Sequence, residues 1–184
     1  PRKGESKLNP VYDAWRHVRF MLFYCPLWLY FVPGLIGLTI GTAVSLLLLK
    51  GPLLFMGRPW DIHVMIFASM LSILSYQVIN LGVYAHTFGI RHGLLRYDRI
   101  TLTFQRLFTL EKGLILGGVV FAAGMVMIVS IVVEWFVRDF GALYRMRESI
   151  LAMTFIVIGL QTMFSSFFIS LLFVEKAESP LWID

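Results

Sequence analysis

Four long stretches of this chain contain no Asp, Glu, Lys or Arg, and they limit its fold more than any other feature. Each has at least the roughly 20 residues that a helix needs to cross about 30 Å of hydrocarbon at about 1.5 Å per residue. Because a segment in lipid must satisfy its own backbone hydrogen bonds, these stretches are expected to be helices. We predict an all-α membrane protein with transmembrane helices at about residues 27–49, 62–86, 113–133 and 149–174.

The composition and the distribution of charge agree with a membrane protein. Hydrophobic residues make up 58% of the chain and charged residues 15%, whereas soluble domains average about 25% charged. Eleven of the sixteen Lys and Arg residues lie in the N-terminal segment, the central loop and the C-terminal tail. Positive loops stay on the cytoplasmic side, so both termini are predicted to be cytoplasmic. We assign the net charge of +5 to contact with lipid headgroups and expect no nucleic acid partner.

Two amphipathic segments are predicted to lie on the cytoplasmic face of the membrane. The first covers residues 9–25, where apolar residues recur on one helical face. Its polar residues Arg16, His17 and Arg19 are expected to contact lipid headgroups. The second is an interfacial helix in the central loop, at about residues 99–110.

Small and polar residues recur at helical intervals within the predicted spans. Glycines predict close helix packing in a compact bundle, and they are Gly34, Gly37 and Gly41 in the first span and Gly113, Gly117 and Gly124 in the third. Polar residues form a face on the second and fourth spans, and they are Ser69, Ser72, Tyr76, Asn80, Thr154, Gln161 and Ser165. These faces fit either a polar groove or interhelical hydrogen bonds, and we favour the hydrogen bonds. Glu134, directly after the third span, is interpreted as an interfacial anchor rather than a proton carrier.

The sequence offers little for catalysis. It has no Asp-x-Asp pair, no phosphate-binding glycine-rich loop and no G-x-S-x-G motif, and its four histidines lack ligand spacing. We therefore assign no catalytic residue and no metal ligand. Arg2, Ser6 and Lys7 lie around the flexible Gly4, and such a set suits the oxygens of a diphosphate or a lipid phosphate. Taken alone, a basic stretch beside a membrane more often sets topology and contacts headgroups.

Three runs of the sequence resemble one known family. They are Gly4-Glu5-Ser6-Lys7-Leu8, then residues 13–22 (DAWRHVRFML) with 26–29 (PLWL), and residues 159–168 (GLQTMFSSFF). The first two are similar to the membrane-proximal end, and the third to the last span, of family 2 polyprenyl-phosphate glycosyltransferases, relatives of dolichol-phosphate mannose synthase. The resemblance covers nearly the whole chain.

The resemblance implies an N-terminal catalytic GT-A domain that precedes residue 1 on the cytoplasmic side and ends in residues 1–8. That domain would transfer a sugar from a nucleotide donor to a polyprenyl or dolichyl phosphate with a divalent metal, Mg or Mn, which it would bind itself. Arg2, Ser6 and Lys7 are carried over as contacts to the donor diphosphate or the lipid phosphate. Residues 26–174 would anchor the enzyme and guide the lipid acceptor, residues 175–184 would form a cytoplasmic tail, and the chain alone would be inactive.

Two other functions stay open. The chain is also long enough to be a freestanding four-helix flippase or transporter of lipid-linked sugars, with the polar faces as its pathway. It could instead be a pure anchor or assembly module, in which the glycines support a homo-oligomer. From the form of the family we expect a bacterial protein of the inner (plasma) membrane.

Overall fold

The structure is a computed structural model that describes residues 11–16, 26–91, 110–142 and 144–173. Four long helices make up most of it, and they are α2 (Pro26–Leu49), α3 (Ile62–Arg91), α5 (Leu110–Val137) and α6 (Met146–Phe173). Each is long and apolar enough to cross a bilayer. The prediction of an all-α membrane protein with four transmembrane helices is therefore confirmed.

Three of the helices extend past the predicted spans. α3 continues to Arg91 instead of ending near His86, and α5 and α6 each begin three residues earlier than predicted, at Leu110 and Met146. The predicted bounds follow the stretches that lack charge, but a helix can continue into the headgroup layer, where charged side chains meet water and lipid phosphates. Glu111 illustrates this, because its carboxylate in the first turn of α5 favours the positive end of the helix dipole.

The predicted surface helices are described only in part. Residues 11–16 are helical, with the apolar side chains of Val11 and Trp15 exposed. The remainder of the segment at 9–25 and the loop helix at 99–110, apart from Leu110 at the start of α5, lie outside the described residues. The same holds for residues 1–8 and the tail at 175–184.

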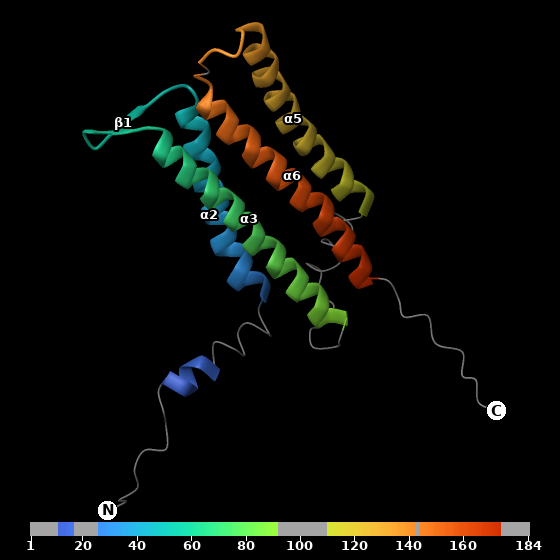
Figure 1. Ribbon diagram of the computed structural model, residues 1–184. Coiled ribbons are helices and arrows are strands. Elements are labelled where there is room, and N and C mark those ends of the chain that lie inside the picture. The colour runs from blue at the N-terminus through green and yellow to red at the C-terminus, as the bar shows by residue number, and fades with distance from the viewer. Residues whose placement is uncertain (1–10, 17–25, 92–109, 143, 174–184) are drawn as a thin grey trace, which may run out of the picture.

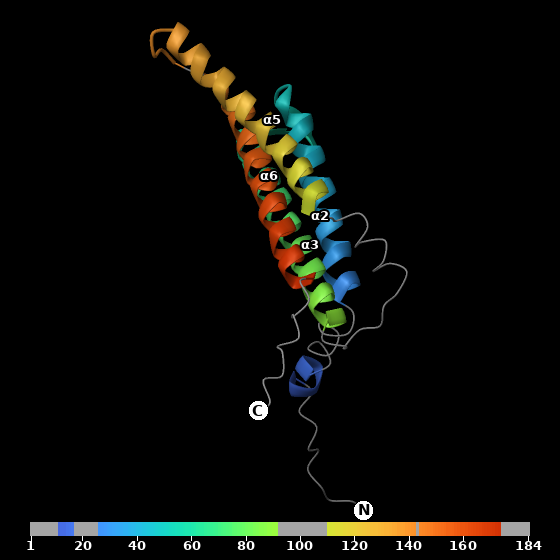
Figure 2. The same cartoon turned by 90° about the vertical axis from the view of Figure 1, so that its right-hand side faces the viewer.

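The four long helices stand in a row in the order α2, α3, α6, α5 (Figure 1). α2 packs along α3 and α5 packs along α6, and contact between α3 and α6 joins the two pairs. Figure 2 shows that the end of α5 and the turn after it extend beyond the other helices. The glycines bring the helices together in pairs, and Leu48 of α2, Met65 of α3 and Leu151 of α6 form a buried core where three of the helices meet.

The predicted close packing at glycines is confirmed within each pair. A Cβ atom added to Gly41 of α2 would lie 2.5 Å from the carbonyl oxygen of Ala68 on α3. On α5, a Cβ atom added to Gly117 would lie 2.8 Å from the carbonyl oxygen of Gly159 on α6. No side chain fits at such distances, so the helix backbones approach closely. Because these glycines face helices of their own chain, they give no support to a subunit interface.

A short β-hairpin connects α2 to α3. Its strands β1 (Leu53–Phe55) and β2 (Arg58–Trp60) are antiparallel, and Leu53 lies opposite Trp60. Met56 and Gly57 both have positive φ angles, of 51° and 74°, which is the conformation of a type I′ turn. Below, the end of the domain that carries this hairpin is called the hairpin end. The opposite end, where α2 begins and α6 ends, is called the terminal end.

Candidate functional site

The phosphate site predicted from the sequence cannot be placed. Arg2, Ser6, Lys7, His17 and Arg19 all lie outside the described residues. Arg16 is the last residue of the described helix at 11–16, and its side chain is exposed. The phosphate-contacting role of the first three residues and the headgroup contacts of the others stay predictions.

Hydroxyl groups join the two central helices across their interface. The hydroxyl groups of Tyr76 on α3 and Thr162 on α6 share a hydrogen bond of 2.6 Å. Ser69 on α3 and Thr154 on α6 form a second hydroxyl pair nearer the hairpin end. Unpaired hydroxyl groups are costly in hydrocarbon, so these bonds hold α3 against α6. For these four residues, hydrogen bonding between helices is the role that the structure shows.

The rest of the polar face opens into a groove between α3 and α6, nearer the terminal end. The groove has a volume of about 410 Å³, and its lining residues are Gln77, Asn80, Leu81 and Tyr84 of α3 and Gln161, Phe164 and Ser165 of α6. None of these side chains is charged. Tyr84 donates a hydrogen bond of 2.5 Å to the hydroxyl oxygen of Ser165 and closes one wall. Both interpretations of the polar faces therefore hold, each for a different part of the interface.

One polar atom of the groove is left without a hydrogen bond. The Oε1 atom of Gln161 is buried and has no hydrogen-bond partner in the part of the chain that the structure describes. A buried acceptor without a donor costs about 1–3 kcal/mol. The amide oxygen of Gln161 thus stays unsatisfied inside the protein, and it has no exposed surface from which a ligand in the groove could reach it.

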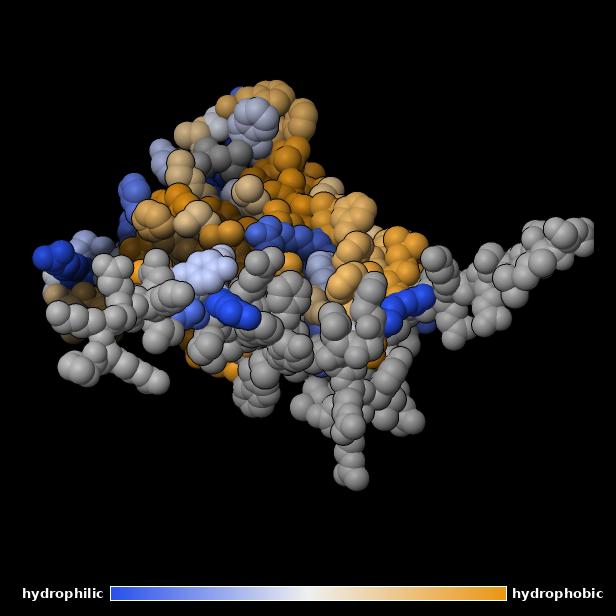
Figure 3. All heavy atoms as spheres, turned by 90° about the horizontal axis from the view of Figure 1, so that it is seen from below, coloured by the Kyte–Doolittle hydropathy of each residue, from blue (hydrophilic) through white to orange (hydrophobic). Residues whose placement is uncertain are grey.

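Arg91 lies beyond the groove, at the terminal end of α3. It is the last residue of α3, and its Nη1 atom donates a hydrogen bond of 2.5 Å to the carbonyl oxygen of Leu172, near the end of α6. The last carbonyl groups of a helix carry partial negative charge, so this contact suits a cation. Arg91 lies seven residues after Tyr84, on the same face of α3. Seen from the terminal end (Figure 3), the visible flanks of the helices are mainly hydrophobic, with hydrophilic side chains in a few places.

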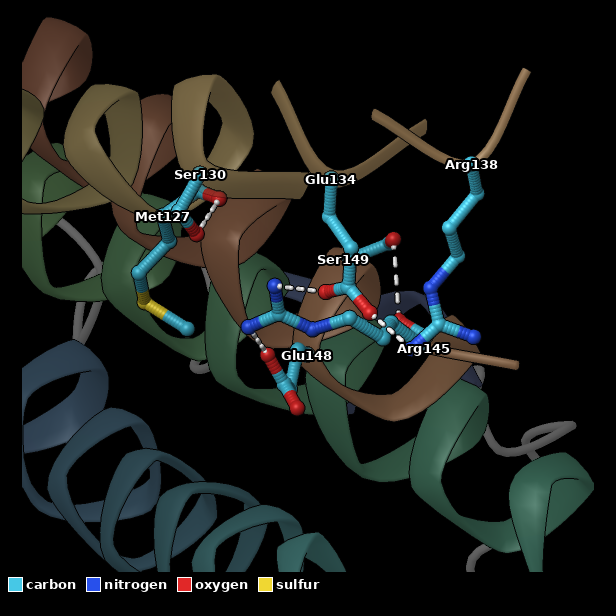
Figure 4. A network of polar contacts seen from close by, with 7 residues as sticks. All are labelled: Met127, Ser130, Glu134, Arg138, Arg145, Glu148 and Ser149. Carbon is cyan, nitrogen blue, oxygen red and sulfur yellow. Dashed lines mark hydrogen bonds and ion pairs between the residues drawn. The ribbon is translucent and has the colours of Figure 1, made fainter. Parts of the chain in front are cut away.

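A second polar cluster lies at the hairpin end, where α5 meets α6 (Figure 4). Glu134 forms ion pairs with Arg138, at 2.6 Å, and with Arg145, at 2.9 Å. Arg145 also pairs with Glu148, and this hydrogen bond raises the pKa of the Arg145 guanidinium. Since Glu134 has two cationic partners at the end of its helix, the structure agrees with an anchoring role and gives no support to proton transfer.

An ion pair at the same end links α6 to the start of α3. Arg147 pairs with Asp61, and their hydrogen bond lowers the pKa of the Asp61 carboxyl. The carbonyl oxygen of Asp61 accepts hydrogen bonds from the amides of Val64, at 2.9 Å, and Met65, at 3.1 Å, so Asp61 caps α3. Among the described residues there is no group of three or more His, Cys, Asp or Glu side chains that could hold a metal ion.

Several of these residues were not among the predicted ones. Gln77 and Tyr84 were not identified as lining residues, although with Asn80 they follow helical spacing along one face of α3. That spacing was the signal that could have identified the groove. No pattern in the sequence indicates that Asp61 pairs with Arg147. The two residues are far apart in the chain, and charged residues of either sign are expected at the membrane interface.

The fold and the groove define a multi-pass integral membrane domain. Residues 83–173 match the glycosyltransferase family 2 C-terminal transmembrane region. The chain is also 32% identical, over 167 residues, to the low-salt glycan biosynthesis hexosyltransferase Agl6 of Haloferax volcanii. Residues 83–173 therefore correspond to the C-terminal transmembrane region of family 2 glycosyltransferases.

These similarities cover the two proteins unequally. The alignment with the hexosyltransferase includes 91% of this chain, but the chain spans only about 40% of the length of that curated relative. No solved structure matches the chain. Of the groove residues, Tyr84, Gln161, Phe164 and Ser165 fall inside the matched family region.

Proposed function

We propose that the protein containing this chain transfers a hexose from a nucleotide donor to a polyprenyl or dolichyl phosphate, and that this chain anchors the enzyme and guides the lipid acceptor. The observation that carries the proposal is the match of residues 83–173 to a family 2 glycosyltransferase membrane region, together with similarity to a hexosyltransferase. The sugar transfer itself belongs to a GT-A domain that precedes this chain and uses a divalent metal, Mg or Mn.

The membrane domain has a physical reason to take part in such a reaction. A polyprenyl phosphate keeps its chain in the bilayer, while its phosphate must meet a water-soluble donor. Four helices that fix the catalytic domain at the membrane surface turn this encounter into a positioned one. Cationic side chains at that surface stabilise phosphate charge during the transfer. In this proposal Arg2, Ser6 and Lys7 contact the donor diphosphate or the lipid phosphate, and both termini are cytoplasmic, with the bacterial inner membrane as the expected location.

The transport alternative is less well supported. A flippase needs a polar path across the bilayer, and the groove supplies polar side chains only near the terminal end. Toward the hairpin end, the exposed side chains of α3 and α6 include Met70 and Met153, which are 50% and 63% exposed. The other hydroxyl groups, on Ser69, Tyr76 and Thr154, are engaged in hydrogen bonds between the helices. The described part of the domain thus holds helices together where a carrier would need a path.

The proposal is tested with the full-length protein in proteoliposomes. Transfer of labelled hexose from a panel of nucleotide sugars to polyprenyl phosphate should give a labelled product in the organic phase. Replacing both Ser6 and Lys7 with Ala should raise the acceptor KM at least about tenfold, since each tenfold is about 1.4 kcal/mol and a hydrogen bond to a charged group is worth about 1.5–3 kcal/mol.

Lys50→Ala is the matched control, because it removes one cation at the hairpin end, where α2 ends. It should leave the acceptor KM unchanged. No transfer with any donor of the panel would contradict the proposed reaction. Transfer that is normal in the double variant would leave the reaction standing and remove the phosphate role of Ser6 and Lys7.

A further inference from the structure

We propose that the β-hairpin between α2 and α3 dips into the lipid leaflet at the hairpin end. In this arrangement its apolar face, formed by Leu54 and Pro59, lies against the lipid chains, and Arg58 on the opposite face contacts the lipid phosphates. The partner of this surface is therefore the bilayer itself. The proposal concerns the membrane domain alone and does not depend on the proposed glycosyl transfer.

The two helices that the hairpin joins fix its level in the membrane. α2 ends at Leu49 and α3 begins at Ile62, and both helices are long and apolar enough to cross a bilayer. Lys50 and Trp60 at the root of the hairpin are of the types that concentrate at the boundary of the hydrocarbon. Figure 1 shows the hairpin pointing sideways, away from the row of helices, rather than along their axes. It therefore stays near the level of the boundary, where lipid molecules surround the helices.

The two faces of the hairpin differ in polarity. Successive side chains of a strand point to opposite faces, and residues opposite each other on paired strands share a face. Leu54 lies opposite Pro59, so their face carries no polar side chain, whereas Arg58 lies opposite Phe55 on the other face. The ring centroids of Phe55 and Trp60 lie 4.9 Å apart on that second face. An apolar face opposite a face with a cation and aromatic rings is typical of an element at a membrane interface.

The protein leaves the apolar side chains of the hairpin uncovered. Leu54 and Met56 are 83% and 90% exposed. Beyond the pairing of the two strands, the main contact of the hairpin is between β2 and α3, where Trp60 packs against the core at Leu48 and Met65. A hairpin with three residues in each strand is marginally stable in water, and exposed apolar side chains do not help it. In a lipid leaflet the same side chains are removed from water and stabilise the hairpin.

The backbone of the hairpin limits how deep it can lie. The outer edges of two strands leave N–H and C=O groups unpaired, and such groups are costly inside the hydrocarbon. Near the boundary, water and headgroups can reach them. Pro59 has no N–H group, so the outer edge of β2 has one donor fewer to satisfy. The same feature makes strand pairing with a second copy unfavourable at this edge, so lipid is the better partner.

Arg58 is placed to contact a lipid phosphate. Its side chain is exposed and forms no ion pair among the described residues, whereas Arg138, Arg145 and Arg147 at the same end all pair with carboxylates. A long Arg side chain can hold its guanidinium at the phosphates while the backbone that carries it lies deeper. Guanidinium groups match the oxygens of phosphate in charge and geometry.

Depth measurements on the full-length protein in phosphatidylglycerol vesicles test the proposal. Native cysteines, Cys25 among them, are replaced with Ser, and one nitroxide at a time is attached through Leu54→Cys, Met56→Cys or Arg58→Cys. Oxygen concentrates in lipid and a nickel chelate in water, so the ratio of their collision rates with the nitroxide reports its depth. The ratio should be several-fold higher at positions 54 and 56 than at the matched control, Asp139→Cys. That control lies in the turn that extends beyond the other helices at the same end (Figure 2).

The same labels test which face of the hairpin meets the phosphates. A nitroxide broadens the NMR signals of nearby phosphorus nuclei, so the label at position 58 should broaden the lipid phosphate signal several-fold more than the label at position 54. The ratio of collision rates should be lower at position 58 than at position 54, because the two side chains lie on opposite faces.

Three results would overturn the proposal. One is a ratio at positions 54 and 56 as low as at position 139, which would place the hairpin in water. The second is equal depth and equal phosphorus broadening at positions 54 and 58, which would contradict the assignment of the two faces. The third is dipolar broadening between labels at position 56 that disappears on dilution with unlabelled protein, which would place a second copy at the hairpin.

Discussion

Arg147 on α6 forms an ion pair with Asp61, the residue that caps the start of α3. The pair joins the two central helices at the hairpin end, and Arg91 joins them at the terminal end through the carbonyl oxygen of Leu172. Between these two contacts, α3 and α6 are held by hydroxyl groups. The junction between the two helix pairs thus uses polar contacts along its length, whereas each pair is held by glycine packing.

Removing the charge of Asp61 should lower the thermal stability of the protein. Asp61→Asn takes away the carboxylate that pairs with Arg147 and leaves the capping carbonyl group in place, so the midpoint temperature of unfolding should fall. The measurement is thermal unfolding of the full-length protein in detergent. Asp139→Asn, in the exposed turn after α5, is the control and should have no effect. Equal midpoints for both variants would show that the pair does not stabilise the junction.

The same pair should make stability depend on pH in the acid range only. Arg147 holds the pKa of Asp61 below its usual value, so Asp61 contributes stability above its unfolded pKa of about 4 and loses it as the pH falls through the folded pKa. The difference in midpoint temperature between the wild-type protein and Asp61→Asn should stay constant from pH 7 to about pH 5. Below about pH 4 it should shrink. A difference that grows on acidification would have the wrong sign for this pair.

Adjacent glycines of α5 should respond in opposite ways to alanine. A Cβ atom added to Gly117 would lie 2.7 Å from Met163 and 2.8 Å from the carbonyl oxygen of Gly159. A Cβ atom added to Gly118 would have no neighbouring atom within 4 Å. Gly117→Ala should lower the free energy of unfolding by about 1–3 kcal/mol. Gly118→Ala should raise it by up to about 1 kcal/mol, because Ala favours the helix. Urea or SDS unfolding measures both, and similar losses in the two variants would refute close packing at Gly117.

The hydroxyl pair of Tyr76 and Thr162 should be coupled in a double-mutant cycle. Tyr76→Phe and Thr162→Val each remove one partner of a 2.6 Å hydrogen bond and keep the shape of the side chain. The coupling energy should be about 0.6 kcal/mol and at most about 1.7 kcal/mol, the range for hydrogen bonds between membrane helices. Pairing Tyr76→Phe with Thr39→Val, on the far side of α2, serves as the uncoupled control. A coupling of zero for both pairs would assign the contact no energetic role.

The sequence was sufficient to predict the four helices and the glycine contacts for a physical reason. A helix that crosses a bilayer needs a stretch without charge, and a close approach of two helices needs glycine, so both features can be recognised within a single segment of the sequence. The ends of the helices are harder to predict, because charged residues such as Arg91 are tolerated beyond the boundary of the hydrocarbon. The hairpin at Leu53–Trp60 was missed because its strands have three residues each.

The row of helices and the groove could not be predicted in the same way. A polar face shows that a helix has polar neighbours, but the type of residue does not say whether that neighbour is a side chain or a ligand. Tyr76 meets Thr162, whereas Gln161 leaves its Oε1 atom without a partner among the described residues. The order of the helices depends on which pairs pack, and this requires the contacts themselves.

The order of the helices also has a consequence for how the domain is made. α2 and α3 are consecutive in the chain, and so are α5 and α6, so each tightly packed pair leaves the ribosome as a unit. The first pair can insert and close on its glycines before the second has been synthesised, and the two pairs then meet along α3 and α6. The groove is formed only at this last step. A ligand of the groove could therefore bind only after both helix pairs have been made and have met.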